Sequence, residues 1–292
     1  MHPPVAPPDP RRSWDLPPFG AMPTVERLTL ELLRVVAPNP SPMTLDGTNT
    51  YVLGAAGTGE VVIVDPGPDD PGHRRRVDDA VAELDAEVRA IALTHHHPDH
   101  AEAAAGWAAD LGCPVLAPTA HLAVDAPVMV GGDRLDLRDV EVTVIATPGH
   151  TRDHVAFRLG SGAVLTGDHV LGRGTSVVVH PDGDLEAYLD SLQRVYDLGP
   201  SALHPGHGPS LTEDPGAVLS YYTEHRRYRE LQLKHALREG PAGLDALVAR
   251  LYADVDRRLW PAAAASLSAL LALLRARGEV HLDVGARYHL VV

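Results

Sequence analysis

Residues 94–100 read Thr-His-His-His-Pro-Asp-His, and this stretch decides the fold because it gathers metal-ligand side chains behind a strand. The apolar run 88–93 before it is typical of a buried β-strand. A tight loop leaving such a strand can direct several side chains toward one point. Imidazole and carboxylate groups are the ligands that Zn²⁺ and related divalent ions take up. The three imidazoles of His95, His97 and His100 and the carboxylate of Asp99 exceed what one tetrahedral ion takes from one loop, so the pattern favours two adjacent metals.

Three further turns repeat the pattern and argue against a chance cluster in a chain with 17 His. Residues 147–151 follow the apolar run 142–146, residues 167–169 follow 163–165, and residues 204–208 follow a short Ala-Leu segment. Each strand-like run ends in a Gly-containing turn that presents a His or an Asp. Parallel-type sheets place ligands outside the carboxyl ends of their strands. The turns therefore predict one shared site.

In their order and spacing, the His-x-His-x-Asp-His run, His150, Asp168 and His207 resemble the metallo-β-lactamase superfamily of dinuclear metallohydrolases. A closer resemblance, to the lactamase-β-like endoribonuclease subgroup, lies in residues 39–51, 150–154, 171–175 and 222–229. It implies an α/β fold, a four-layer αββα metallo-β-lactamase sandwich with a small C-terminal helical, winged-helix-like domain. We expect a Pro-rich arm over 1–20 that is disordered or draped on the surface, a catalytic domain over 21–216 and the helical domain over 217–292.

Hydrophobic periodicity gives the expected elements of this arrangement. Gly240-Pro241 marks a clear break after a long helix, and the helices beyond it lead into an alternating hairpin. Strands are expected at 25–36, 50–54, 60–64, 88–93, 115–117, 130–137, 140–146, 154–159 and 163–166, helices at 74–89, 101–111, 185–198, 217–238, 244–252 and 261–277, and a hairpin at 280–292.

The candidate ligands divide into two sets joined by one carboxylate. Two ions about 3.5–4 Å apart can share a hydroxide nucleophile, because a metal lowers the pKa of bound water to about 7. Two Zn²⁺ per chain are expected, although Mn²⁺ or Fe²⁺ could occupy the same ligands. We expect His95, His97 and His150 at the first metal, Asp99, His100 and His207 at the second, and Asp168 bridging, with Asp99 and Asp168 as the catalytic residues.

Other residues carry weaker signals. Asp65, at a strand end, is a candidate to orient a ligand His by hydrogen bonding, with a turn role as the alternative. Asn49, His154 and Arg173 are candidates for substrate binding, against structural hydrogen bonds or a surface position. The flanking His96, His169 and His204 are interpreted as bystanders.

Charge bears on the substrate. Residues 221–292 hold 11 basic and 8 acidic residues, net +3, which leaves 14 basic and 31 acidic residues in 1–220, net −17. A catalytic domain with such a negative charge repels phosphate at long range. Aromatic residues, on which bases could stack, make up only 4% of the chain. The resemblance implies cleavage of single-stranded RNA, whereas the charge favours a small-molecule acyl ester or thioester. A metal-stabilised nucleic-acid-binding or regulatory protein without turnover is the alternative from another class.

Bulk properties indicate a cytoplasmic protein. Cys113 is the only cysteine, so no internal disulfide can form. No run of 18 apolar residues suggests a membrane span, and the Pro-rich start does not resemble a secretory signal. The resemblance is compatible with a homodimer.

Overall fold

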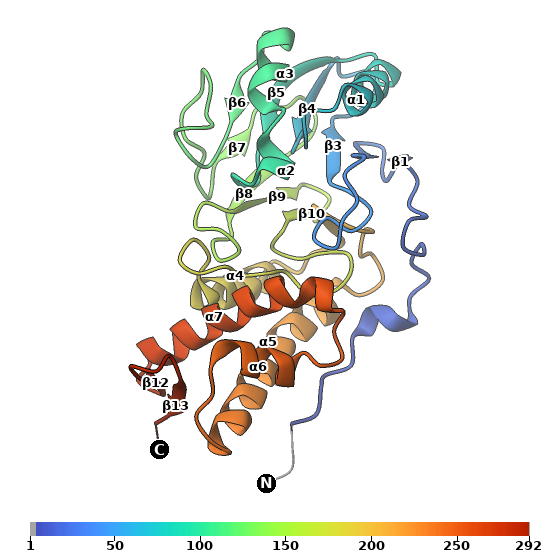
Figure 1. The fold of residues 1–292 in the computed structure, drawn as a ribbon. Helices are drawn as coiled ribbons and strands as arrows, with labels where there is room; N and C mark the ends of the chain where they lie inside the picture. Colours follow the sequence, from blue (N-terminus) through green and yellow to red (C-terminus); the bar gives the residue numbers. More distant parts are fainter. Residues whose placement is uncertain (1–3, 292) are drawn as a thin grey trace.

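The structure is a computed structural model that describes residues 4–291, and two β-sheets lie face to face between layers of helices (Figure 1). The first sheet has the order β1-β2-β3-β4-β5-β6 and the second β11-β10-β9-β8-β7. The strands are β1 Val25–Arg27, β2 Leu32–Val36, β3 Asn49–Leu53, β4 Glu60–Val64, β5 Glu87–Ala92, β6 Val115–Leu116, β7 Arg134–Leu135, β8 Val142–Ala146, β9 Val155–Leu159, β10 Val164–Gly167 and β11 Leu203–Pro205.

Strands of the first sheet are buried on both faces, because helices cover one face and the second sheet covers the other. Along β4, Val61 and Ile63 pack with the helices α1 (Pro71–Glu83) and α3 (Ala104–Leu111). The alternate residues Val62 and Val64 enter the core between the two sheets. This two-sided burial explains why the strands read as continuous apolar runs.

The outer face of the second sheet is covered by α4 (Leu185–Asp197), which places Tyr188, Leu192 and Val195 in a third core together with the C-terminal helices. Asp184 starts this helix by accepting a hydrogen bond from the Ala187 N–H at 2.9 Å. The four layers expected from the resemblance are therefore confirmed.

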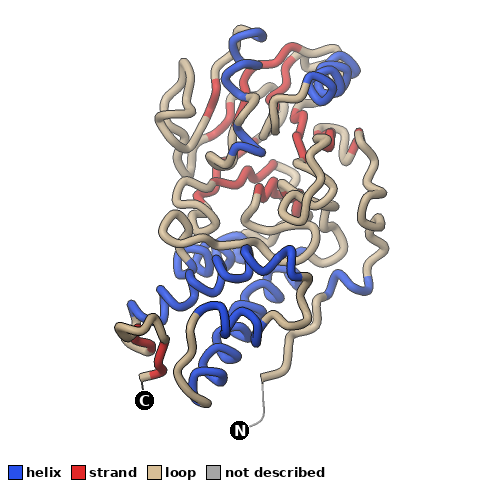
Figure 2. The backbone as a smooth tube through the Cα atoms, in the orientation of Figure 1, coloured by secondary structure: helices blue, strands red, loops and turns tan. Residues whose placement is uncertain are grey.

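The C-terminal region is helical and ends in a two-stranded hairpin (Figure 2). By length and composition alone, 257–276 is apolar enough to cross a membrane. Its Leu267, Leu271 and Leu274 are instead buried in the core shared with α4 and α5. The elements are α5 Pro215–Arg238, α6 Leu244–Leu251, the 3₁₀-helix η2 Arg257–Leu259, α7 Trp260–Ala276, β12 Val280–Leu282 and β13 Tyr288–Leu290.

The Pro-rich N-terminal arm is ordered from residue 4 onward, so the option of disorder is wrong there, and residues 1–3 lie outside the described residues. It includes the 3₁₀-helix η1 (Pro10–Ser13) and runs from the C-terminal helices to the first sheet (Figure 1). Arg11 is 5% exposed and donates to the carbonyls of Leu171 and Gly174 at 2.9 and 2.7 Å. Composition cannot reveal such distant partners.

Four expected elements differ clearly from the observed ones. The helix expected over 101–111 begins at Ala104 as α3 and follows the separate short helix α2 (Pro98–Ala101). The strand expected over 25–36 is two paired strands, β1 and β2. The helix expected over 74–89 ends at Glu83, and Asp85 adopts a positive φ of 50° before β5 begins. The strand expected over 130–137 is reduced to Arg134–Leu135, because residues 130–133 form a turn.

Candidate metal centre

All seven expected ligands meet at one edge of the sandwich, where the loops after β5, β8, β10 and β11 converge. Their ligand atoms form two groups in which every pair of atoms lies within 4.8 Å. Gly206 permits this convergence, since a Cβ there would lie 2.7 Å from both Asp168 Oδ1 and His100 Cε1. One group is His95, His97, His150 and Asp168, and the other is Asp99, His100 and His207.

The first group is a trio of imidazoles. Nδ1 of His97 lies 3.0 Å from Nε2 of His95 and 3.1 Å from Nε2 of His150. Burial lowers the pKa of all three, to about 4 for His97, so that the rings are neutral at pH 7. Three neutral imidazoles offering nitrogen lone pairs to a common point are a fitting set for a divalent ion with an open fourth position.

The second group combines two buried imidazoles with a half-exposed carboxylate. Nε2 of His207 lies 3.2 Å from both Nε2 of His100 and Oδ2 of Asp99. Burial opposes a proton on His207, but the Asp168 carboxylate prevails and raises its pKa to about 9. The same carboxylate, with Asp65, raises the pKa of His100. Against the effect of burial, His100 lowers the pKa of Asp99 to about 2.

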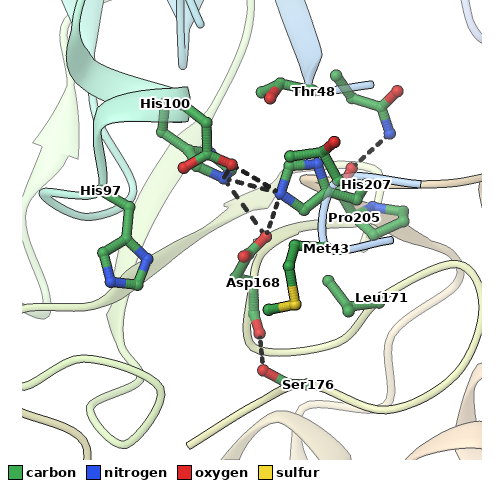
Figure 3. A network of polar contacts seen from close by, with 12 residues as sticks. Met43, Thr48, His97, His100, Asp168, Leu171, Ser176, Pro205 and His207 are labelled. Atoms are coloured by element: carbon green, nitrogen blue, oxygen red, sulfur yellow. Dashed lines mark hydrogen bonds and ion pairs between the residues drawn. The ribbon is translucent and has the colours of Figure 1, made fainter. Parts of the chain in front are cut away.

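Asp168 joins the two groups through its two oxygens, and Figure 3 shows its contacts with His100 and His207 of the second group. Oδ1 lies 3.4 Å from Nε2 of His100 and 3.3 Å from Nε2 of His207, while Oδ2 lies 3.6 Å from Nε2 of His150. Oδ1 is buried and makes ion pairs with the His100 and His207 imidazoles but no hydrogen bond of good geometry. When the two imidazoles release their protons, a bound cation would supply the charge that this buried carboxylate requires.

The hydrogen bonds on the outer ring nitrogens also fit a bound cation. Nδ1 of His150 donates to the Val177 carbonyl at 2.6 Å, and Nδ1 of His100 donates to Asp65 at 2.8 Å. Nδ1 of His95 faces the Thr94 hydroxyl at 2.9 Å. Protons held at these Nδ1 atoms leave the Nε2 lone pairs directed inward, which is how proteins commonly prepare His ligands.

Asp65 acts through this hydrogen-bond layer. Besides His100 Nδ1, it accepts from the Thr94 N–H at 2.8 Å and from the Thr94 hydroxyl at 2.7 Å. Its backbone lies in the left-handed region, with φ of 50°, and the residue is 2% exposed. The structure thus places Asp65 where it orients a candidate ligand.

Two residues expected to bind substrate hold the site together instead. Asn49 is fully buried, and its side-chain amide donates to the carbonyls of Pro205 and Gly208, both at 2.8 Å. His154 is 1% exposed and its Nε2 accepts from the Asp168 N–H at 3.1 Å. Neither residue lines the cavity at the metal centre, and both make structural hydrogen bonds, which was the alternative expectation.

A cavity of about 310 Å³ opens onto the metal centre, and Arg173 lies in its wall. Sequence reasoning missed Ser176, whose hydroxyl donates to the Asp168 carbonyl, because its pattern carries no ligand signal. The contribution of the C-terminal domain to the cavity wall was also not predicted, because it depends on contacts between residues far apart in the sequence. The lining of the catalytic domain includes Met43 and Leu171, which lie beside Asp168 in Figure 3.

Comparison with known proteins agrees with this geometry. The Metallo-beta-lactamase superfamily model matches residues 43–207, and the Beta-lactamase associated winged helix domain matches residues 244–284. The Beta-lactamase-like protein 2 homolog of Drosophila melanogaster is 31% identical over 286 residues, covering 92% of this chain and 96% of that protein. The atrochrysone carboxyl ACP thioesterase of Aspergillus chevalieri is 35% identical over 230 residues, covering 77% and 70%.

A solved structure extends the agreement to the whole fold. The crystal structure of a metallo-beta-lactamase family protein from Thermus thermophilus superposes with a TM-score of 0.75 at 26% identity, covering 91% of this chain and all of that one. The alternative of a binding protein without turnover is therefore set aside. The chain belongs to the metallo-beta-lactamase superfamily and is a hydrolase of that superfamily with a C-terminal winged helix domain.

Proposed function

We propose that the protein is a dinuclear zinc hydrolase of acyl esters or thioesters. One observation carries the proposal, namely that the cavity reaching His150 and Asp168 has a largely apolar wall. An acyl chain needs such a wall, with its carbonyl at the metal end. The apolar lining comes from both domains and consists of Pro42, Met43, Leu45, Leu171, Val177, Val255, Leu259, Ala262 and Ala263.

The residues of the chain divide the work at the metal end. Zinc ions bound by the two groups would supply an activated water and a Lewis acid for the substrate carbonyl. Asp168, held through its backbone by His154 and Ser176, keeps one oxygen toward each group. Asp99 remains ionised above about pH 2 and is half-exposed, so its carboxylate can accept a hydrogen bond at the mouth of the site.

Two further observations support an acyl substrate over RNA. Residues 1–220 carry a net charge of −17, from 14 basic and 31 acidic residues, which opposes binding of a polyphosphate chain at long range. The Aspergillus chevalieri relative is named a thioesterase. Cleavage of single-stranded RNA is the second candidate, favoured by the winged helix match over 244–284, because such domains can bind nucleic acid.

The test is a parallel assay of acyl thioesters, acyl esters and single-stranded RNA, each with zinc and with manganese. We expect thioester or ester turnover, about two metal equivalents per chain, and loss of turnover in the His95→Ala/His97→Ala variant with folding retained. The exposed His121→Ala serves as the matched control and should keep full activity. Turnover of RNA alone would select the second candidate, and one metal equivalent would contradict the dinuclear centre.

A further inference from the structure

Three arginines line the cavity that opens onto the metal centre. Arg173 follows β10, whereas Arg226 and Arg229 come from α5, and all three share the lining with the candidate ligands His150 and Asp168. Asp168, at the metal end, is the only acidic residue in the lining. Within residues 4–291, no carboxylate oxygen lies within 4.0 Å of a nitrogen of these three guanidinium groups. The cavity therefore contains three cations without carboxylate partners.

The contacts that these side chains do make are with neutral groups. Arg226 donates to the Ser176 carbonyl and lies 5.1 Å from the ring centre of Tyr188. Arg229 donates to the Leu251 carbonyl at 2.7 Å and lies 4.3 Å from the ring centre of Tyr252. Such partners fix the guanidinium positions while leaving their charge uncompensated.

Each guanidinium also keeps an unused donor. The Nε atoms of Arg173, Arg226 and Arg229 are all buried without a hydrogen-bond partner. Arg226 as a whole is only 9% exposed. A buried cation without a charge partner is unfavourable unless a ligand supplies the missing charge.

The neighbouring His225 reports the positive field of these arginines. It lines the cavity, and burial followed by the charges of Arg226 and Arg229 lowers its pKa to about 3. The imidazole is therefore neutral at pH 7, and its buried Nδ1 has no hydrogen-bond partner. It adds a polar atom to the three guanidinium groups without adding charge.

We infer that Arg173, Arg226 and Arg229 form an anion subsite that selects acyl substrates carrying an anionic group in addition to the scissile ester or thioester. This inference rests on the proposed function and names the class of its substrate. The anion is a carboxylate on the acyl chain or a phosphate on the leaving thiol, since Arg recognises both through the same planar donors.

The surroundings favour a small molecule over a nucleic acid. The subsite lies within a cavity of about 310 Å³ whose other walls are mainly aliphatic. Tyr252 is the only Phe, Tyr or Trp in the lining, whereas proteins that bind single strands stack successive bases on several aromatic rings. One anionic group on an otherwise apolar substrate matches the lining better than a chain with a phosphate on every unit.

The test measures anion preference by calorimetry, using non-hydrolysable thioether analogues and the full-length metal-loaded protein. The analogues are a neutral acyl thioether, the same thioether with a terminal carboxylate, and the neutral acyl thioether of pantetheine with and without its 4′-phosphate. The variants are Arg173→Gln and Arg229→Gln. Arg227→Gln is the matched control, because Arg227 lies on the same helix but is exposed and outside the cavity.

We expect the protein to bind one anionic analogue at least about tenfold more tightly than its neutral partner, as a charge-assisted hydrogen bond allows. The Arg229→Gln and Arg173→Gln changes should reduce this ratio toward one, and Arg227→Gln should leave it unchanged. The analogue that shows the preference identifies the carboxylate or the phosphate as the source. Equal binding of anionic and neutral analogues to the unaltered protein would overturn the subsite.

Hydrolysis of the matching neutral thioester is measured alongside, so that the two proposals fail separately. Turnover of the neutral thioester without anion preference refutes the subsite and leaves the hydrolase standing. Anion preference without turnover of any ester or thioester supports the subsite and refutes the proposed function. Loss of binding to a single-stranded RNA oligomer in Arg229→Gln, with the analogue ratio unchanged, would assign the arginines to nucleic acid and also overturn the inference.

Discussion

Replacing Asp65 with Asn tests whether the second group of ligands depends on a correctly placed proton. The backbone tolerates the change, because Asn is among the residues that adopt the left-handed conformation found here at φ of 50°. The new amide oxygen can still accept from the Thr94 N–H, as Oδ1 does now at 2.8 Å. The new amide nitrogen replaces Oδ2 and becomes a donor facing Nδ1 of His100, which now donates at 2.8 Å.

In Asp65→Asn we expect the His100 ring to change its tautomer. Nδ1 then accepts from the amide, and the proton passes to Nε2, the atom that lies 3.2 Å from Nε2 of His207. A protonated Nε2 cannot bind a metal. The hydrogen bond from His100 to a charged carboxylate is lost, and the new bond from the amide replaces only part of its energy. The net loss in metal-binding free energy is about 2 kcal/mol, or about thirtyfold in affinity for one ion. This agrees with the 10–100-fold losses typical of such outer-layer changes.

Chelator competition with metal analysis would measure the effect. We expect one of two metal equivalents to weaken about thirtyfold, the equivalent bound by His95, His97 and His150 to be less affected, and the secondary structure to be retained. The exposed Asp79→Asn, on α1, is the matched control. Two unchanged equivalents in Asp65→Asn would refute the reasoning, and so would equal weakening of both.

Three further outcomes are expected. Metal affinity should rise with pH up to about 9, because the raised pKa values of His100 and His207 require proton release on binding, and pH-stat titration measures those protons. In the metal-free protein the same His207 proton contributes stability that is full below pH 6.5 and lost as pH rises through about 9, a loss that denaturant midpoints would register. Gly149→Ala should lower the melting temperature strongly, because φ is 143° and the new Cβ would clash with the backbone of Tyr188. Gly106→Ala is the control, because a Cβ there meets open space. Equal melting temperatures of the two variants would contradict the prediction.

The sequence predicted which side chains come together, because the signal is local. Every expected ligand follows a strand-like run, and the structure brings these strand ends together at one edge of the sandwich. The roles of Asn49 and His154 could not be predicted in this way. Asn49 donates hydrogen bonds to carbonyls 156 and 159 residues away. His154 accepts a hydrogen bond from the backbone N–H of Asp168, whose direction depends on the turn at Gly167. In the sequence, a polar residue near a site looks the same whether its side chain contacts the substrate or forms hydrogen bonds with the backbone.

The fold shows the same division between local and distant information. Boundaries that depend on a cap or a turn are within a few residues, as for α4, expected at 185–198 and found at Leu185–Asp197. The cavity wall shared by the two domains was not foreseen, because Arg226 and Arg229 read simply as charged residues on a long helix. Their position over the metal centre depends on how α5 packs on α4, which residue spacing within one helix does not encode.

The buried Arg11 has a consequence for the order in which the molecule assembles. Its guanidinium meets carbonyls 160 and 163 residues further along the chain, and it lies 5.5 and 5.6 Å from the ring centres of Tyr221 and Tyr222. During synthesis the arm leaves the ribosome before the segments that it contacts, and its binding surface is completed only after α5 has emerged. Contacts so far apart in sequence close late in folding, so the arm docks after segments that follow it in the chain.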